Sequence, residues 1–241
     1  MSDFLFQNNN GGSEDHWISI SDMMTAIMLI FLLIAISFMI KVSEEKRQIE
    51  GVAESYFNLK NELYNDLNNE FKGDLTKWDA EILRDSLIFR YEDVDVMFET
   101  GESELTPQFK AILSDFFPRY INLLQQVKYK DEIAEIRIEG HTSSEWEGAN
   151  SQLEAYLNNM KLSQDRSRKV LAFSIKLKDV LDKQEWLIKY VTANGLSSSK
   201  PVPQSKTNPI EDKKRSRRVD FRALLKLEKR IEEISQGGDK N

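Results

Sequence analysis

The N-terminal part of the chain contains a long apolar segment. Residues 23–40 carry no charge and only two hydroxyl side chains, and with residues 17–22 they reach the roughly 20 residues that a helix needs to cross a bilayer. A cleaved signal peptide and a buried core helix are the alternatives, but acidic residues precede the segment and no small-residue cleavage site follows it. We therefore predict one transmembrane helix over residues 17–40, preceded by a tail of residues 1–16.

Asp22 is the charged residue of the predicted membrane helix. A carboxylate in a lipid-facing helix is costly, so it normally faces protein or a water-filled cavity. One interpretation is that Asp22 caps the start of the helix and interacts with the helix dipole. The other places it about one turn inside the membrane, because Trp17 and Ile18 already suit the lipid boundary. Ser19 and Ala26 share its helix face, and such small residues would let a neighbouring helix approach closely.

A second helical segment follows the apolar one. Residues 42–71 contain no proline and one glycine, and their apolar positions step by three and four, as in a heptad seam. We predict a helical stalk within residues 41–78, in which two copies of the chain pair as a coiled coil. The alternative is a single amphipathic helix lying on the following domain. The seam residues are Ile49, Val52, Tyr56, Leu59 and Leu63.

The remaining residues mix strand and helix patterns. They are interpreted as one domain over residues 79–230, followed by a tail of residues 231–241. The order of elements predicts an α+β fold, an α/β sandwich with helices packed on one face of a sheet. Strands are expected at residues 86–91, 95–98, 135–139, 186–193 and 219–225. Helices are expected at residues 106–127 and 162–181, the second capped by Ser163, with a loop at residues 142–159.

Composition narrows the possible functions. The net charge of −7 is too acidic for a general nucleic-acid binder, and the basic run at residues 213–218 is interpreted as a solvated loop edge beside Glu211 and Asp212. The chain has no cysteine, which excludes disulfides and cysteine-ligated zinc. Its two histidines, His16 and His141, lie far apart in sequence. We therefore expect no enzyme activity, no cofactor and no metal, with His141 in a structural role.

The charges beside the apolar segment bear on its orientation. Lys41, Lys46 and Arg47 follow the segment, whereas no lysine or arginine precedes it. By the positive-inside rule alone, the C-terminal part would lie in the cytoplasm.

Five ordered motifs resemble those of OmpA-like peptidoglycan-binding domains. Gly140-His-Thr resembles the G-H-T-D strand end of that family, and the arginine of an N-x-x-L-S-x-x-R helix falls at Arg166. The second glycine of G-x-G-x-x-x-P is replaced by Ser197, and serine stands at Ser216 where asparagine is usual before the closing strand. The motifs occupy residues 98–107, 138–142, 159–170, 195–201 and 217–221.

This resemblance implies a peptidoglycan-binding site. In the family, the helix arginine, here Arg166, meets the carboxylate of the peptidoglycan diamino acid, and an aspartate meets its ammonium group. Serine takes the aspartate position at Ser143, so half of the charge pair is kept, and Glu145 or Glu147 could supply the missing charge. The implied site residues are Thr142, Ser143, Asn159, Leu162, Arg166 and Arg218.

The membrane segment resembles that of MotB-like stator subunits. Residues 17–26 match the W-x-x-x-x-D-x-M-T-A span of that family. Their sequence resembles the ZorB branch, which belongs to the Zorya anti-phage system, more closely than it resembles flagellar proteins. The resemblance implies that Asp22 carries protons across the bacterial inner membrane. It places the N-terminus in the cytoplasm and the C-terminal domain in the periplasm, against the charge bias. It further implies that two copies of the chain form a homodimer, surrounded by a ring-shaped pentamer of MotA-like (ZorA-like) partners. The other implied partners are peptidoglycan and protons.

Other functions stay open on the sequence alone. The chain could be a flagellar MotB-like stator subunit, or a passive anchor whose span only tethers it to the wall. The acidic N-terminal tail differs from the basic tail usual in flagellar proteins. Protons are expected as the coupling ion in preference to sodium because they are usual in the family that the chain resembles.

Overall fold

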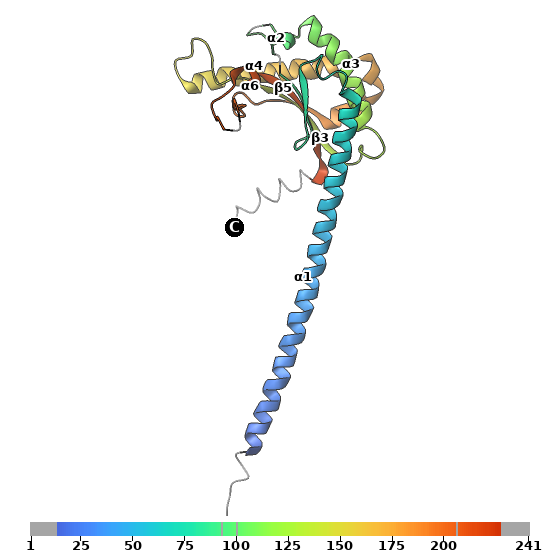
Figure 1. The fold of residues 1–241 in the computed structure, drawn as a ribbon, viewed down its shortest axis with the longest axis vertical. Helices are drawn as coiled ribbons and strands as arrows, with labels where there is room; N and C mark the ends of the chain where they lie inside the picture. The colour runs from blue at the N-terminus through green and yellow to red at the C-terminus, as the bar shows by residue number, and fades with distance from the viewer. Residues whose placement is uncertain (1–13, 93, 100, 206, 228–241) are drawn as a thin grey trace, which may run out of the picture. The chain divides into compact units, whose positions relative to one another are not determined.

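The computed structural model describes residues 14–92, 94–99, 101–205 and 207–227 (Figure 1). The chain divides into two compact units, Met1–Phe57 and Asn58–Asn241. Helix α1 (Glu14–Phe71) supplies the helix of the first unit and the first element of the second. Each unit is described by itself.

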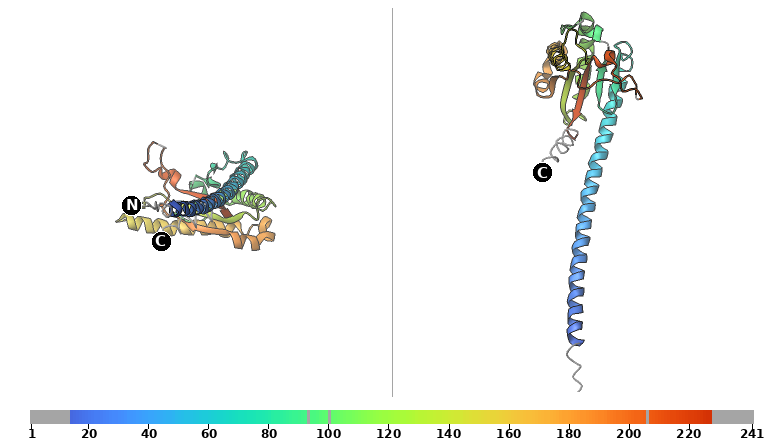
Figure 2. Two further views of the ribbon diagram at one scale, coloured as in Figure 1. Left: turned by 90° about the horizontal axis from the view of Figure 1, so that it is seen from below. Right: turned by 90° about the vertical axis from the view of Figure 1, so that its left-hand side faces the viewer.

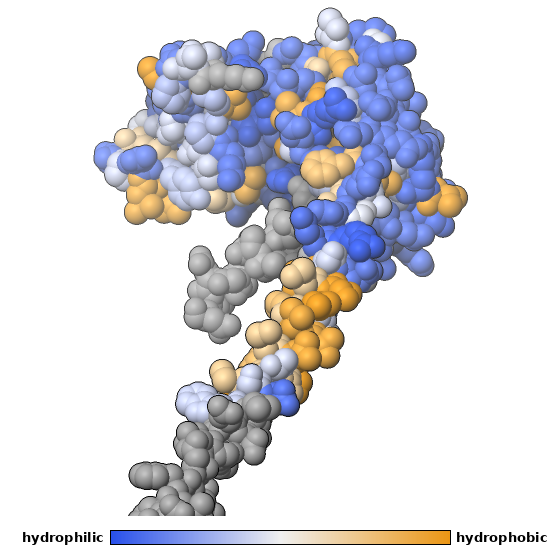
Figure 3. All heavy atoms as spheres, turned by 60° about the horizontal axis from the view of Figure 1, so that its bottom comes forward, coloured by the Kyte–Doolittle hydropathy of each residue, from blue (hydrophilic) through white to orange (hydrophobic). Residues whose placement is uncertain are grey.

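In the first unit, Ile20–Glu44 is long and apolar enough to cross a membrane. None of its most apolar window is buried inside the chain, and exposed side chains such as Phe31 and Met39 form a continuous apolar surface in Figure 3. A helix that is apolar all round needs lipid or partner helices around it. The segment coincides with most of the predicted span at residues 17–40.

The last turns of α1 belong to the second unit and pack onto it. Leu63, Leu67 and Phe71 are fully or almost fully buried. The Phe71 ring lies 5.2 Å from the ring of Phe89 and 5.3 Å from that of Phe116. This end of α1 is therefore an amphipathic helix lying on the domain, as one of the two interpretations of the stalk expected.

Polar contacts fix the same end of α1. Arg119 donates to a Glu70 carboxylate oxygen at 2.7 Å, and its guanidinium also stacks over the Phe71 ring. Leu63, which the heptad pattern assigned to the dimer seam, is buried by the chain's own domain. A coiled coil over the earlier residues 49–59 stays a prediction.

The second unit is built on a five-stranded sheet with the order β1-β2-β5-β3-β4. Neighbouring strands are antiparallel except β3 and β4, which are parallel. The strands are β1 (Ala80–Leu83), β2 (Ile88–Tyr91), β3 (Ile133–His141), β4 (Val191–Gly195) and β5 (Arg218–Leu225). The helices are α2 (Val94–Met97), α3 (Pro107–Leu124), α4 (Gln152–Ser174), the 3-10 helix η1 (Lys178–Lys183), α5 (Gln184–Tyr190) and α6 (Lys213–Ser216).

Helices α3 and α4 pack on one face of this sheet, which confirms the predicted α+β sandwich (Figure 2). Phe116 of α3 lies 4.4 Å from Phe89 of β2 and 5.0 Å from Phe221 of β5, measured between ring centroids. Rings at these separations combine burial of apolar area with favourable edge and offset contacts. The other face of the sheet carries mainly charged side chains.

Several predicted elements are confirmed. Strands occur within residues 86–91 and 219–225 and around residues 135–139. The helix expected from residue 106 begins at Pro107, and the side chain of its N-cap, Thr106, accepts a hydrogen bond from the Phe109 main-chain N–H.

Other predicted elements are wrong. Residues 95–98 are not a strand, because α2 occupies most of them and Phe98 forms only an isolated bridge with Leu105. Trp186 lies in α5, and the strand expected from it starts at Val191. The pattern search missed β1, whose four residues are half-buried and do not alternate.

Helix α4 begins ten residues before the predicted start at residue 162. Its N-cap is Ser151, whose side chain accepts from the Glu154 main-chain N–H, while Ser163 lies buried in the middle of the helix. The Ser-x-x-Glu start signal at residues 151–154 identifies this position in the sequence. The expected loop at residues 142–159 therefore ends at the α4 N-cap.

Glycines at the ends of β3 and β4 let α4 approach the sheet closely. A Cβ added at Gly140 would lie 2.4 Å from the main-chain oxygen of Ser163, and one added at Gly195 would lie 2.4 Å from the main-chain nitrogen of Gln164. Such distances are too short for any real Cβ contact, and backbone atoms cannot move aside as a flexible side chain can. Both motifs therefore need glycine at these positions, because only glycine leaves room for the α4 backbone.

We expect Gly140→Ala to destabilise the domain by roughly 1–3 kcal/mol, the usual cost of forcing extra atoms into a packed site. The measurement is the free energy of unfolding of the full chain in detergent, from urea denaturation. Gly73→Ala is the control, because a Cβ there meets nothing within 4 Å. Equal stability of the two variants would contradict the packing role.

Candidate functional site

Helix α4 carries polar side chains on the face that it turns to the sheet. Asn159, Ser163 and Arg166 recur at helical spacing and are all buried. The Asn159 amide donates to the main-chain oxygen of Glu145 at 3.0 Å, which ties α4 to the loop after β3. Leu162 is half-buried one turn before Arg166. Polar groups on a buried helix face need specific partners, so this face is a candidate site.

The end of β3 meets the loop after β4 at the same place. Thr142 donates its main-chain N–H to the Ser197 oxygen at 3.0 Å, and Ser197 donates its own N–H to the Ser163 hydroxyl at 3.0 Å. The Thr142 hydroxyl is buried without a hydrogen-bond partner among the described residues. Thr142 and Ser143, both buried, are thus brought to the N-terminal half of α4.

Ser197 explains the glycine of the family motif. Its φ of 50° lies in the left-handed region, which costs a residue other than glycine roughly 1–2 kcal/mol. The Ser197 hydroxyl donates to the Tyr156 main-chain oxygen at 2.9 Å, and this bond offsets part of the cost. The loop therefore keeps the glycine conformation with serine in place.

Arg166 is held rigidly in the candidate site. Its Nε donates to the Glu102 main-chain oxygen at 2.9 Å, and its guanidinium carbon lies 4.7 Å from the centroid of the Phe98 ring. Burial, together with the nearby charge of Arg217, lowers the pKa of Arg166 to about 10, while Asp95 opposes the change. Within the described part of the chain, no carboxylate lies at ion-pair distance from this guanidinium.

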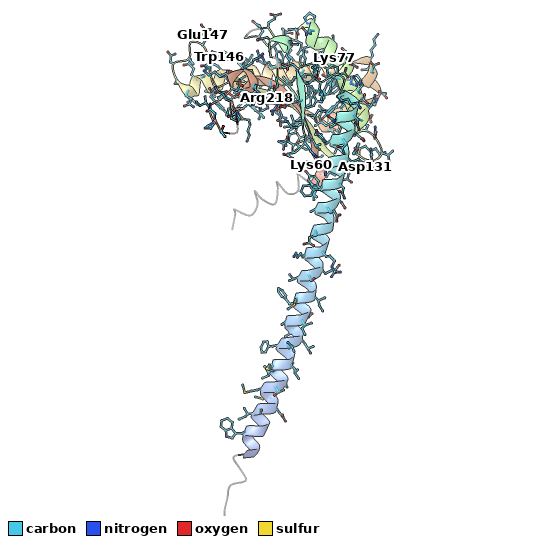
Figure 4. The ribbon with its side chains drawn as sticks, viewed as in Figure 1. Lys60, Lys77, Asp131, Trp146, Glu147 and Arg218 are labelled. Carbon is cyan, nitrogen blue, oxygen red and sulfur yellow. The ribbon has the colours of Figure 1, made fainter. Side chains whose placement is uncertain are left out.

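The structure separates Arg218 from the other predicted site residues. Arg218 pairs across the sheet with His141, whereas its neighbour Val219 pairs with Gly140 on the face that α4 covers. The Arg218 guanidinium donates to Asp220 Oδ2 at 3.1 Å and to two main-chain oxygens at 3.2 Å. Arg218 thus has a structural role in the sheet's other face (Figure 4).

Arg217 takes the place that the sequence assigned to Arg218. It is half-buried, its Nε has no hydrogen-bond partner among the described residues, and its charge acts on Arg166. Arg218 is the first residue of β5, whereas Arg217 follows α6 directly and precedes that strand. The sequence alone does not show which of the two arginines acts on Arg166, because that depends on where β5 begins.

Known proteins similar to this chain contain the same kind of domain. The OmpA family model matches residues 97–217. The Zorya protein ZorB of Escherichia coli is 44% identical over 223 residues, which cover 92% of this chain and 93% of that protein. The chain belongs to the ZorB family of OmpA-domain proteins. A MotB-like protein from Desulfovibrio vulgaris, known from its crystal structure, is 21% identical, with a TM-score of 0.51, over 73% of this chain and 99% of that one. At this identity the likeness shows the fold alone.

This ZorB-family chain does not replace the missing OmpA-type carboxylate with the residues expected. Glu145 forms an ion pair with Lys213, and Glu147 is exposed in the loop before α4, beside Trp146 (Figure 4). Asp95 of α2 is the carboxylate whose charge reaches Arg166, and no motif pointed to it. The candidate site of this ZorB-family member is therefore cationic.

Two guanidiniums, Arg166 and Arg217, dominate what this site can do chemically. A buried cation without a paired anion is unfavourable, and a carboxylate that accepts hydrogen bonds from guanidinium groups relieves it. The Thr142 hydroxyl, buried without a hydrogen-bond partner among the described residues, is a neutral donor at the end of β3. The arrangement suits a small ligand group with a carboxylate.

Separate roles for the two neighbouring arginines can be measured in this ZorB-family chain. We expect Arg218→Ala to lower the free energy of unfolding by about 1.5–3 kcal/mol, since hydrogen bonds to a charged group are lost. Arg217→Ala should change it by at most about 0.5 kcal/mol, because its guanidinium lacks such bonds. Urea denaturation of the full chain in detergent is the measurement, and the opposite order would refute the assignment.

Proposed function

We propose that the chain is a proton-conducting stator subunit of the bacterial inner membrane that serves anti-phage defence. Two copies of the chain form a dimer, and five MotA-like (ZorA-like) subunits form a ring around it. The observation that carries this proposal is that one chain, 44% identical to a Zorya ZorB protein, joins an apolar helix to an OmpA-family domain. The N-terminus lies in the cytoplasm and the domain in the periplasm.

The domain holds the dimer to peptidoglycan. Arg166 and Arg217 bind the carboxylate of the diamino acid in the wall peptide, and the Thr142 hydroxyl and the Asn159 amide line the same site. Ser143 provides no charge for the ammonium group of the ligand. Recognition here therefore depends more on the two guanidiniums than it does in OmpA-like domains that keep the aspartate.

Asp22 carries the proton. It lies close to the start of the apolar segment Ile20–Glu44, where a carboxylate is tolerated only beside protein or water. Neutralising Asp22 changes how the dimer helices contact the ring, and ionising it restores the first contact. Repeated in order, these changes turn the ring against a dimer that the wall holds still.

Binding to the wall tests the first half of the proposal. We expect Arg166→Ala and Arg217→Ala each to weaken pelleting of the chain with purified peptidoglycan at least tenfold in apparent affinity. The loss of a hydrogen bond to a charged group costs about 1.5–3 kcal/mol, and each 1.4 kcal/mol is about a factor of ten.

Arg168→Ala is the matched control for this assay. Arg168 lies on the same helix, but its side chain is 70% exposed, and its ion pair within the described residues is with Asp165 of the same helix. It should pellet as the wild type does. If Arg166→Ala and Arg217→Ala also pelleted like the wild type, these arginines would have no part in wall binding.

Protection against phage tests the second half. We expect Asp22→Asn to abolish protection in cells that carry the complete system, because the amide cannot exchange a proton. Co-purification with the MotA-like partner should persist, since asparagine keeps the shape of the side chain. Ser37→Ala, in the same apolar segment, is the control and should protect normally. Full protection by Asp22→Asn would leave only a tether function.

A further inference from the structure

The face of the sheet opposite α3 and α4 carries a row of polar residues across all five strands. The strand register places Glu81 beside Arg90, Arg90 beside Asp220, Asp220 beside Glu139 and Glu139 beside Asn194. Asp220 and Glu139 are thus two carboxylates on adjacent strands. Like charges directly opposite each other destabilise a sheet unless a cation lies between or beside them.

Two arginines donate to Asp220, whereas no arginine or lysine among the described residues lies at ion-pair distance from Glu139. Arg90 donates to both carboxylate oxygens of Asp220, at 2.9 and 3.1 Å, and Arg218 donates to one of them at 3.1 Å. These contacts hold the pKa of Asp220 below its ordinary value although burial opposes this. Glu139 is buried, and its Oε2 lies 3.7 Å from His141 Nε2. That distance is longer than a hydrogen bond.

His141 offers an unused donor at the same place. Only 3% of the residue is exposed, and neither ring nitrogen has a hydrogen-bond partner in the described part of the chain. Burial lowers the pKa of His141, and Arg218 adds to this, although Glu139 and Asp220 oppose it. A neutral imidazole has a lone pair that can bind a metal ion.

The three side chains have the geometry of a metal site. One ligand atom from each of Glu139, His141 and Asp220 can be chosen so that all lie within 4.8 Å of one another. His141 Nε2 lies 3.5 Å from Asp220 Oδ2 and 3.7 Å from Glu139 Oε2. Ligands of a tetrahedral ion with bonds near 2.1 Å lie about 3.4 Å apart, so only small side-chain movements are needed.

We propose that Glu139, His141 and Asp220 bind a zinc ion. One imidazole nitrogen and two carboxylate oxygens are a ligand set typical of zinc. The three residues line a hollow of about 680 Å³, together with others that include Leu196 and Lys200, and this hollow gives the ion a path from solvent. Arg90 and Arg218 hold the Asp220 carboxylate in position, as outer groups commonly do for metal ligands.

The charges around the site favour zinc over calcium or magnesium. The hollow has more cations than carboxylates in its lining, so the ion gains nothing from net charge: the cations are Arg90, Arg137, Lys200, Arg218 and Arg222, and the carboxylates are Glu135, Glu139 and Asp220. Calcium and magnesium depend on several oxygen ligands and on carboxylate charge, whereas zinc gains more from its bond to the imidazole. The ion would join the end of β3 to the start of β5, directly before Thr142 of the candidate wall site. This inference does not depend on the proposed function.

Metal content and stability of the full chain in detergent test the proposal. After treatment with a chelator, zinc is added, excess is removed by dialysis, and bound metal is measured by mass spectrometry. We expect one zinc per wild-type chain and a midpoint of thermal unfolding several degrees higher than without metal. Calcium and magnesium should produce neither effect.

Two substitutions locate the ion. Glu139→Gln keeps the shape of the side chain, so it should fold, and it should bind zinc at least tenfold more weakly; His141→Gln should do the same. His16→Gln removes the chain's other histidine and should bind zinc normally. The proposal fails if the wild type retains no zinc, if Glu139→Gln and His141→Gln retain it fully, or if calcium or magnesium stabilises the chain equally.

Discussion

A charge that leaves water must find a partner, and this constraint shapes both units of the protein. In the domain, Arg166 is buried and Arg217 half-buried, and neither has a carboxylate at ion-pair distance among the described residues. In the apolar helix, Asp22 is a carboxylate that lipid alone would not stabilise. As their partners we propose the wall peptide for the arginines, and protons with partner helices for the aspartate.

The geometry that serves these charges depends on how closely α4 lies on the sheet. Gly140 and Gly195 leave no room for a side chain below it, and the Ser163 hydroxyl links α4 to the loop that carries Ser197. Strand alternation places Arg218, His141 and Asp220 on the face of the sheet opposite α4.

Much of this could be predicted from the sequence, and the failures have physical reasons. Hydrophobic periodicity and the Thr106 cap predicted α3, and the glycine and arginine motifs indicated the fold, because these signals are local. Which of Arg217 and Arg218 belongs to the candidate site depends on the register of β5, which is not a local signal. The charge of Asp95 near Arg166 was missed because residues 95–98 were predicted as a strand and most of them form the short helix α2. Glu139 and Asp220 lie far apart in sequence, so counting histidines could not reveal the cluster at His141.

Proton flux through the assembled complex tests the central claim most directly. The chain and its MotA-like partner are placed together in liposomes, a membrane potential is imposed, and internal pH is followed with a fluorescent dye. The account predicts acidification that requires both proteins and disappears when Asp22 alone is replaced by asparagine. Equal flux with and without the Asp22 carboxylate would contradict it.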